Sequence, residues 1–344
     1  MQYRTLGRSG TSVSTLCLGT MTFGDETDEE AAHEQLDAFV EAGGTLVDTA
    51  DVYSAGVSEQ IVGRWLAARP ADVRDRVVLA TKGRFPMADE PNGLGNSRRH
   101  LRRALDASLS RLGVDHVDLY QLHAWDPVTP LEETLRFLDD AVHAGKIDYP
   151  GLSNFTGWQL QKAVDLAERE HLAVPVTLQP SYSLLVRDIE HEIVPACEHN
   201  GLGLLPWSPL AGGWLSGKYT RDQRPTGATR LGEDPDRGIE AYDRVGGRER
   251  TWDVLEAVQD VAEAHSVPMA QVALAWLVAR PAVSSVILGA RTTEQLRQNL
   301  GAADLVLTDD EHARLDTVSA PAVADYPYGG PGLEQRSRKI AGGR

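Results

Sequence analysis

Hydrophobic residues along this chain fall into short runs separated by stretches with helical spacing. The runs occupy residues 16–19, 45–48, 76–82, 116–123, 146–153, 174–179, 202–207 and 283–289. Runs that are almost continuously apolar are typical of parallel strands covered on both faces. Between them, apolar residues recur three and four positions apart, as on the buried side of a helix. The pattern predicts eight strands that alternate with helices.

Polar residues mark where several of these helices begin. We expect Thr27 to cap one helix, and Thr129 to cap another that has Pro130 in its first position. Ser97 is expected to begin a helix with a leucine stripe. Three further helices are expected to begin at Thr156, Thr292 and Thr308.

Eight strand–helix units of roughly 30 residues each indicate right-handed crossovers that close into a (β/α)8 barrel, with an open doubly wound sheet as the alternative. We expect residues 1–344 to form a single barrel domain. Residues 3–14 resemble a hairpin that could cover the barrel floor. Residues 208–248, rich in Gly, Pro and charge, predict a long loop after the seventh strand, and residues 320–344 an irregular C-terminal tail.

Composition narrows the class of protein. The 344 residues carry a net charge of −16, which argues against a protein that binds nucleic acid or a membrane surface. The two cysteines, Cys17 and Cys197, are expected to be reduced and packed rather than bridged. No apolar run approaches the ~20 residues of a membrane span, and the first residues lack a signal core. We therefore expect a cytoplasmic protein.

Four residues with useful chemistry lie at or just beyond strand ends. Asp48, Lys82 and His123 end the second, third and fourth predicted strands, and Tyr53 lies in the loop after Asp48. In a barrel the active site lies at the carboxyl ends of the strands, so these side chains can converge. Taken singly, each could be a surface ion pair, a packed loop residue or a structural histidine.

Together the four residues make a coherent proton-donating unit. A phenol titrates near pH 10, and an adjacent ammonium is expected to lower the pKa of Tyr53. Asp48 would hold Lys82 charged and oriented, and a neutral His123 could position a carbonyl group. The chemistry indicated is protonation of a developing alkoxide, which requires a separate hydride donor.

Six blocks of sequence resemble the signature blocks of the aldo-keto reductase superfamily, in that family's order. They are DTADVYSAGVSE at 48–59, LATKGR at 79–84, DLYQLHAWD at 118–126, GLSNF at 151–155, PWSPLAGGWLSGKY at 206–219 and VILGARTTEQLRQNL at 286–300. The likeness is greatest to bacterial reductases near the potassium-channel β subunits. It implies a barrel enzyme that binds NADPH without a Rossmann domain, with Asp48, Tyr53, Lys82 and His123 catalytic and Tyr53 as the acid.

The resemblance also implies a cofactor site and a small-molecule carbonyl substrate. The implied cofactor contacts comprise nicotinamide-binding residues, a pyrophosphate loop, basic residues near the 2′-phosphate and an adenosine site: Thr20, Met21, Asp48, Ser153, Asn154, Gln179, Trp207, Ser208, Pro209, Leu210, Ala211, Gly212, Lys218, Arg230, Gly289, Arg291, Gln295, Gln298 and Asn299. Members of the family often have Glu where this chain has Gln298. We expect this difference to weaken an adenine contact. Pro150 within the fifth strand predicts a local irregularity.

Other functions remain open at this stage. A barrel aldolase would use Lys82 for a Schiff base, which requires the amine to be neutral. A regulatory subunit would bind NADPH with little turnover, although His123, which can differ in channel subunits, favours an enzyme. No histidine or cysteine spacing indicates a metal site. The substrate pocket is expected in loops 21–27, 84–97, 124–128 and the tail, with Phe23, Phe85, Trp125 and Tyr326 as candidate walls; neither the substrate nor the oligomeric state follows from the sequence.

Overall fold

The eight strands close into a barrel in the computed structural model, which describes residues 1–227, 229–322 and 328. They run parallel in the order β10-β3-β4-β5-β6-β7-β8-β9. Their bounds are β3 (Leu16–Gly19), β4 (Leu46–Asp48), β5 (Val78–Gly83), β6 (Val117–Leu122), β7 (Ile147–Ser153), β8 (Thr177–Gln179), β9 (Gly203–Leu204) and β10 (Val286–Leu288). Backbone bonds from Leu204 N to Ala282 O (2.8 Å) and Ile287 N to Pro206 O (3.0 Å) join the first and last strands. The closed barrel is confirmed and the open sheet is wrong.

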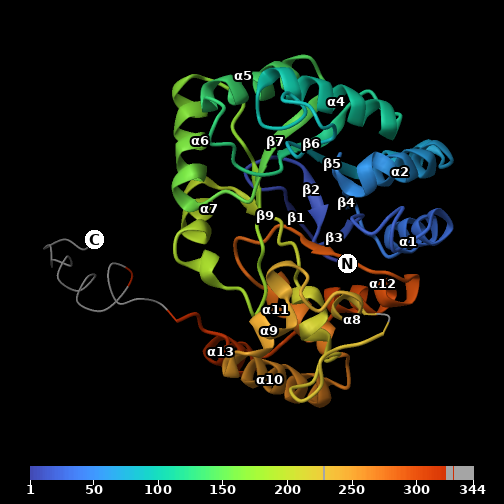
Figure 1. The fold of residues 1–344 in the computed structure, drawn as a ribbon, viewed down its shortest axis with the longest axis vertical. Helices are drawn as coiled ribbons and strands as arrows, with labels where there is room; N and C mark the ends of the chain where they lie inside the picture. Colours follow the sequence, from blue (N-terminus) through green and yellow to red (C-terminus); the bar gives the residue numbers. More distant parts are fainter. Residues whose placement is uncertain (228, 323–327, 329–344) are drawn as a thin grey trace, which may run out of the picture.

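Helices surround these strands (Figure 1). Those that follow one another around the barrel are α1 (Glu29–Glu41), α2 (Val57–Ala67), α4 (Arg98–Leu112), α5 (Leu131–His143), α6 (Gly157–Arg169), α7 (Ile193–Asn200), α11 (Met269–Val278) and α12 (Thr293–Leu300). The others are α3 (Ala71–Arg74), α8 (Arg230–Glu233), α9 (Tyr242–Gly246), α10 (Glu249–His265) and α13 (Asp309–Val318). No single helix of the described residues could span a membrane; only the bent pair α10 and α11 reaches the required length and apolar content together.

A hairpin of β1 (Tyr3–Thr5) and β2 (Ser12–Ser14) covers the amino-terminal end of the barrel, as predicted. Its turn approaches the strands closely. Gly7 has a φ of +55°, and a Cβ there would lie 1.9 Å from the carbonyl oxygen of Val176. Its N–H also donates to Ser284 Oγ at 3.2 Å. Only glycine allows both the positive φ and the close approach to Val176. The hairpin therefore packs tightly against the end of the barrel opposite the strand ends that carry the chemistry.

Two of the predicted helix caps are wrong by one residue. Asp28 rather than Thr27 caps α1, since its carboxylate accepts from Ala31 N at 2.9 Å while Thr27 Oγ1 donates to Thr22. Pro130 rather than Thr129 precedes α5, because Thr129 Oγ1 donates to Asp126 at 2.6 Å. The caps at Ser97, Thr156, Thr292 and Thr308 are confirmed.

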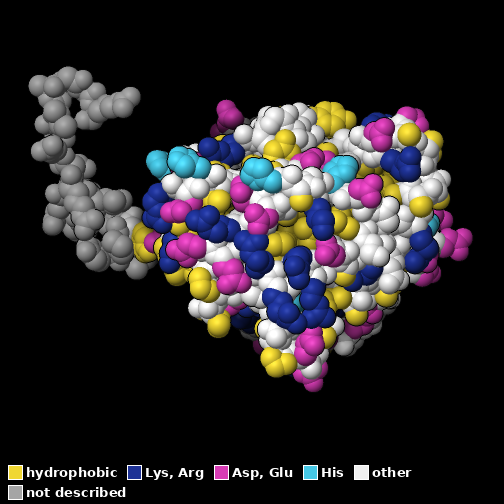
Figure 2. Space-filling view, turned by 90° about the horizontal axis from the view of Figure 1, so that it is seen from above, with side chains coloured by type: hydrophobic (Ala, Val, Ile, Leu, Met, Phe, Trp, Pro, Cys, Tyr) yellow, Lys and Arg dark blue, Asp and Glu magenta, His cyan; other side chains and the backbone are white. Residues whose placement is uncertain are grey.

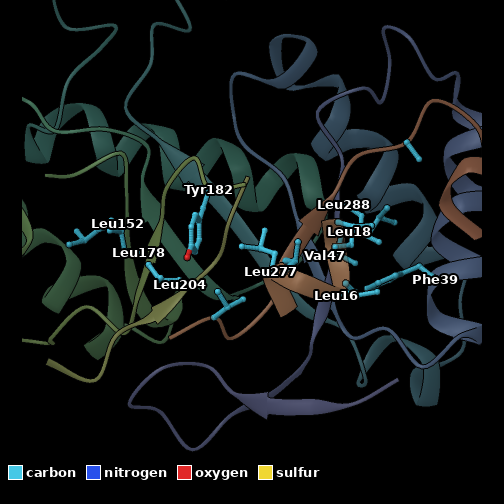
Figure 3. Close-up of a cluster of buried hydrophobic side chains, with 14 of the residues drawn as sticks. Leu16, Leu18, Phe39, Val47, Leu152, Leu178, Tyr182, Leu204, Leu277 and Leu288 are labelled. Carbon is cyan, nitrogen blue, oxygen red and sulfur yellow. The ribbon is translucent and has the colours of Figure 1, made fainter. Parts of the chain in front are cut away.

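Side chains of the strands divide between two apolar cores. One core lies between strands and helices; Figure 3 shows Leu16, Leu18, Val47 and Leu288 of the strands gathered near Phe39 of α1. The other, which includes the alternate strand residues Cys17, Leu46, Val78, Ala80, Leu119, Leu205 and Ile287 with Leu6 and Val13 of the hairpin, fills the barrel interior. Both cysteines are buried and unbridged, as expected.

The strand β7 runs through Pro150 without the expected irregularity. Pro150 pairs in register with Tyr120, and its carbonyl accepts from Val176 N at 3.0 Å. Val176 precedes the start of β8, so the missing N–H falls where β8 offers no ladder partner. A proline at this end of the ladder therefore removes no strand hydrogen bond.

Residues 208–248 are folded rather than an extended loop. They contain 3-10 turns η3 (Ala211–Ser216) and η4 (Gly238–Glu240) together with α8 and α9. Trp214 lies at their centre, fully buried, with its ring 5.1 Å from Tyr219, 5.4 Å from Tyr242 and 5.6 Å from Trp252. These elements are too short to show periodicity in the sequence, which explains why the pattern predicted a loop. Most of the predicted tail, including residues 323–327 and 329–344, lies outside the described residues.

Candidate active site

The barrel interior changes from apolar to polar toward the carboxyl ends of the strands. Because side chains alternate along a strand, the residues that share a face with Leu46, Ala80 and Leu119 point inward. The next inward positions carry Asp48, Lys82, Gln121, Ser153, Gln179 and Trp207. The alternation therefore gathers these side chains over one end of the barrel.

Lys82 is the hub of this polar layer. Its side chain is completely buried, and Nζ donates to Asp48 Oδ2 at 2.5 Å, to Thr49 O at 2.9 Å and to Tyr53 Oη at 3.0 Å. Tyr53 reaches it from η1 (Tyr53–Gly56), where Ser54 and Ala55 have φ of +47° and +53°. Three of the four residues predicted from the strand ends are thus joined by hydrogen bonds.

Burial and charge act in opposite directions on the Lys82–Tyr53 pair. Burial alone would lower the pKa of Lys82, but Asp48 and the phenol outweigh it and hold this pKa above its usual value. Burial also raises the pKa of Tyr53, and the lowering effect of Lys82 does not overcome it. Lys82 thus lowers the pKa of Tyr53 in the expected direction, but burial, which the sequence could not show, leaves the net pKa above its ordinary value. The phenol stays protonated at neutral pH, which is the state a proton donor needs.

His123 lies against Tyr53 and Phe85. Its ring centroid is 5.9 Å from that of Tyr53 and 4.5 Å from that of Phe85. Burial, with the neighbouring charges of Lys82 and Arg84, lowers the pKa of His123 to about 2. The imidazole is neutral at physiological pH, as expected, and its buried Nδ1 has no partner among the described residues.

Gln121, which the strand-end argument missed, completes the layer. Its Nε2 donates to Asp48 Oδ1 at 2.9 Å, as does Nε2 of Gln179, which also donates to Gln121 Oε1 at 3.1 Å. Asp48 therefore accepts from two amides and one ammonium, which fixes the carboxylate. A polar residue two positions before His123 in an apolar strand was the available signal.

Ser153, Asn154, Gln179 and Trp207, implied as nicotinamide contacts, lie in one hydrogen-bonded chain. Ser153 Oγ donates to Gln179 O at 2.9 Å, and Asn154 Nδ2 donates to Ser153 Oγ at 3.1 Å. The indole Nε1 of Trp207 donates to Asn154 Oδ1 at 3.1 Å, and its ring is half-buried at the barrel mouth. The arrangement leaves an aromatic face and amide groups on the same rim as Tyr53, which fits a planar ring that carries a carboxamide.

The segment from Ser208 to Gly213, after β9, is a tightly turned loop of small residues. Ser208, Ala211, Gly212 and Gly213 have φ of +51°, +48°, +67° and +99°. Leu210 has φ −100° and ψ 11°, and the N–H groups of Ala211 and Gly213 donate to Ser208 O at 2.9 Å and Leu210 O at 3.0 Å. The loop is thus a series of tight left-handed turns with small side chains, which lets a bound group approach the backbone closely. This fits the implied pyrophosphate loop.

The basic residues implied for the 2′-phosphate are mostly paired with carboxylates. Arg291 Nε donates to Glu26 at 2.7 Å and Nη2 to Glu233 at 2.7 Å. Arg230 lies 3.2 Å from the buried Glu240, whereas Lys218 is exposed. A phosphate at this site would have to compete with Glu26 and Glu233 for Arg291.

Of the other implied cofactor contacts, some are exposed to solvent and others are already hydrogen-bonded within the protein. Thr20 is buried and within hydrogen-bonding distance of Asp48 O and Ser58 Oγ, whereas Met21 is 43% exposed and lines a pocket. Gly289 borders open space at the end of β10. At α12, Gln295 Oε1 accepts from Arg291 N, Gln298 Nε2 donates to Glu294 and Asn299 is buried. Gln295 thus lies at the start of α12 beside Arg291, whereas Gln298 and Asn299 lie in its last turn.

A pocket of about 380 Å³ opens beside Tyr53 and is lined also by Met21, Gly24, Asp25, Val52, Ser54 and Arg237. Phe23 is not a wall of it, because its ring is fully buried in the core. Phe85 contacts His123, and Trp125 packs against Phe155 and Trp158. Tyr326 lies outside the described residues. No group of His, Cys, Asp or Glu in the described part of the chain is arranged to hold a metal.

Most of the chain is similar in sequence to known proteins of one family. A family model described as "Aldo/keto reductase family" matches residues 15–320. The uncharacterized oxidoreductase YrpG of Bacillus subtilis is 41% identical over 323 residues, 92% of this chain and 94% of that protein. A probable voltage-gated potassium channel subunit beta of Arabidopsis thaliana is 37% identical over 314 residues, 89% of this chain and 92% of the other. Versiconal hemiacetal acetate reductase of Aspergillus parasiticus is 33% identical over 344 residues, 93% of this chain and 98% of the other.

Proposed function

This chain belongs to the aldo/keto reductase family of oxidoreductases. We propose that it reduces an aldehyde or ketone, a class that includes keto sugars, to the alcohol with NADPH, with Tyr53 as the proton donor. The observation that carries this proposal is the buried chain from Asp48 through Lys82 to the hydroxyl of Tyr53, beside a neutral His123. We also propose that the chain works as one barrel domain; a cytoplasmic location stays a prediction.

Each residue of the site has a separate role in stabilising the negative charge that develops on the carbonyl oxygen. Bound NADPH would supply the hydride. Tyr53 gives its proton to the oxygen as negative charge develops there, and Lys82 at 3.0 Å stabilises the phenolate that remains. Asp48 and the two glutamines hold Lys82 and one another in place. The neutral imidazole of His123 can orient the carbonyl without competing as an acid.

Replacing Trp207 by alanine is expected to weaken NADPH binding by about 1–3 kcal/mol, about 5- to 150-fold, because apolar burial and ring stacking are lost. Fluorescence titration with NADPH measures it. Trp207→Phe keeps a stacking ring but loses the donor to Asn154, so it should retain most of the affinity. Full affinity in Trp207→Ala would mean that this ring does not contact the cofactor.

The enzyme is expected to prefer NADPH to NADH, and Arg291→Ala to lose about tenfold of that preference, since a guanidinium pairs with phosphate through charge-assisted hydrogen bonds. Dissociation constants for both cofactors measure it. Arg297→Ala, on the exposed side of α12, is the matched control. Equal wild-type affinity for the two cofactors would show that Glu26 and Glu233 keep Arg291 from the phosphate.

An NADPH-oxidation screen over aldehydes, ketones and keto sugars tests the proposed activity directly. Turnover that falls by about 10²–10⁴ in Tyr53→Phe supports it. The likeness to a channel β subunit keeps a second candidate open, a regulatory subunit that binds NADPH with little turnover. Tight NADPH binding without oxidation by any carbonyl would favour that candidate. The aldolase alternative is disfavoured, because Asp48 and Tyr53 hold Lys82 protonated.

A further inference from the structure

We propose that Arg84 forms a carboxylate-binding subsite of the active site, so that the preferred substrates are carbonyl compounds with an apolar or aromatic body and a carboxylate group. This inference rests on the proposed reductase function and names a class of substrate for it. It follows from the position of Arg84, from a guanidinium without an acidic partner, from a strained backbone and from the side chains around it.

Arg84 lies directly next to the catalytic layer. It follows Lys82 and Gly83 at the carboxyl end of β5, and the N–H of His123 donates to Gly83 O at 3.1 Å. Its guanidinium carbon lies 5.1 Å from the ring centroid of Phe85, which in turn packs 4.5 Å from His123. The guanidinium is therefore one aromatic ring away from the residue proposed to orient the carbonyl.

The guanidinium has few partners for its five donors. Nη2 donates to Trp125 O at 3.3 Å, and the buried Nε has no hydrogen-bond partner among the described residues. Basic residues elsewhere at the site, such as Arg291 and Arg237, are paired with Glu26. A half-buried arginine without a carboxylate partner has a desolvation cost that its few hydrogen bonds to the protein do not offset.

The neighbouring acid Asp126 does not replace such a partner. Its oxygens accept from Asn96 N at 2.8 Å, Val128 N at 3.0 Å and Thr129 Oγ1 at 2.6 Å, and it forms no ion pair with Arg84 within 4.0 Å in the described part of the chain. Asp126 instead organises the loop that follows His123. The charge of Arg84 helps to lower the pKa of Asp126, but the guanidinium has no direct carboxylate contact in the described part of the chain.

The backbone of Arg84 is held in a conformation that few side chains adopt. Its φ is +148°, and its carbonyl accepts from Gly95 N at 2.8 Å, which ties it to the loop before α4. Strained residues of this kind persist where the surrounding structure imposes them and occur most often at functional sites. A merely solvated arginine would not need this geometry.

Charge and shape around Arg84 indicate what it would bind. The charge of Lys82 is matched by Asp48, and His123 is neutral, so Arg84 brings a positive charge without a direct ion pair among the described residues close to the reacting groups. On the face drawn in Figure 2, basic and acidic side chains are interspersed, so the net charge of −16 does not make the surface uniformly acidic. A planar guanidinium matches a carboxylate bidentately, and Phe85, Trp125 and Trp158 offer aromatic surface for the rest of the molecule.

A matched pair of substrates tests the subsite. 4-Carboxybenzaldehyde and methyl 4-formylbenzoate present the same aldehyde with and without a charged group, and kcat/KM is measured for both with NADPH. We expect the wild type to favour the carboxylate, and Arg84→Met to lower the carboxylate-to-ester ratio at least tenfold. Arg84→Lys should retain part of the ratio, and Arg99→Met, an exposed arginine at the start of α4, should leave it unchanged.

The ratio separates substrate recognition from folding, because both substrates are assayed on the same preparation. A wild type without carboxylate preference, or an unchanged ratio in Arg84→Met, overturns the subsite while the reductase function stands. Binding of 4-methylbenzoate, which has neither an aldehyde to reduce nor an alcohol to oxidise, to the NADP-loaded protein is measured in parallel by calorimetry. If no carbonyl is reduced, binding that weakens at least tenfold in Arg84→Met supports the subsite and removes the reductase proposal. Equal binding by both proteins overturns the subsite.

Discussion

Tyr53→Phe is expected to lower kcat for carbonyl reduction by about 10²–10⁴, the usual range for the loss of a general acid. The substitution removes one hydroxyl and keeps the ring beside His123. Lys82 would still donate to Asp48 and Thr49, so the buried ammonium keeps two of its three partners. The protein should therefore fold and bind NADPH, and the loss should fall on the chemical step.

Single-turnover kinetics and NADPH titration of Tyr53→Phe separate these effects. Because the pKa of Tyr53 is raised above its ordinary value near 10, the phenol remains protonated below that pH, and ionisation of Tyr53 should limit the wild-type rate only at higher pH. A near wild-type rate in Tyr53→Phe, with chemistry rate-limiting, would exclude Tyr53 as the acid. His123 would be a poor replacement, since its pKa of about 2 leaves almost no imidazolium at neutral pH.

The strands and the catalytic residues could be predicted because both depend on regular features of the chain. Apolar runs located all eight strands, and the rule that barrel active sites lie at carboxyl strand ends selected Asp48 and Lys82. The alternation of side chains could have selected Gln121 as well, since it shares its face with Leu119. These inferences need only the direction and periodicity of a strand.

The remaining features depend on contacts between distant segments. Lys82 was correctly expected to contact Tyr53, but the balance between its charge and the burial of the phenol needs three-dimensional packing. The sequence could not show that Glu26 and Glu233 pair with Arg291, because they lie 265 and 58 residues away from it along the chain. The short helices of residues 208–248 are fixed by packing around Trp214 rather than by periodicity. Sequence patterns cannot express such pairings.

Lys82→Met is expected to reduce both activity and stability. Removing the ammonium raises the pKa of Tyr53 further and leaves the phenolate product without a counter-charge, so kcat should fall by about 10² or more. The same change leaves Asp48 buried with only the amides of Gln121 and Gln179. An uncompensated buried charge typically costs about 3–5 kcal/mol in the free energy of unfolding. Urea denaturation and single-turnover kinetics measure the two losses.

The double variant Asp48→Asn/Lys82→Met distinguishes the electrostatic explanation from a simple packing defect. An asparagine needs no counter-charge, so the double variant should recover most of the lost free energy of unfolding. It should not recover activity, because Tyr53 still lacks its cationic neighbour. A double variant as unstable as Lys82→Met would attribute the loss to packing around the lysine stem. A double variant that regained carbonyl reduction would show that the charge of Lys82 is not what makes Tyr53 an effective acid.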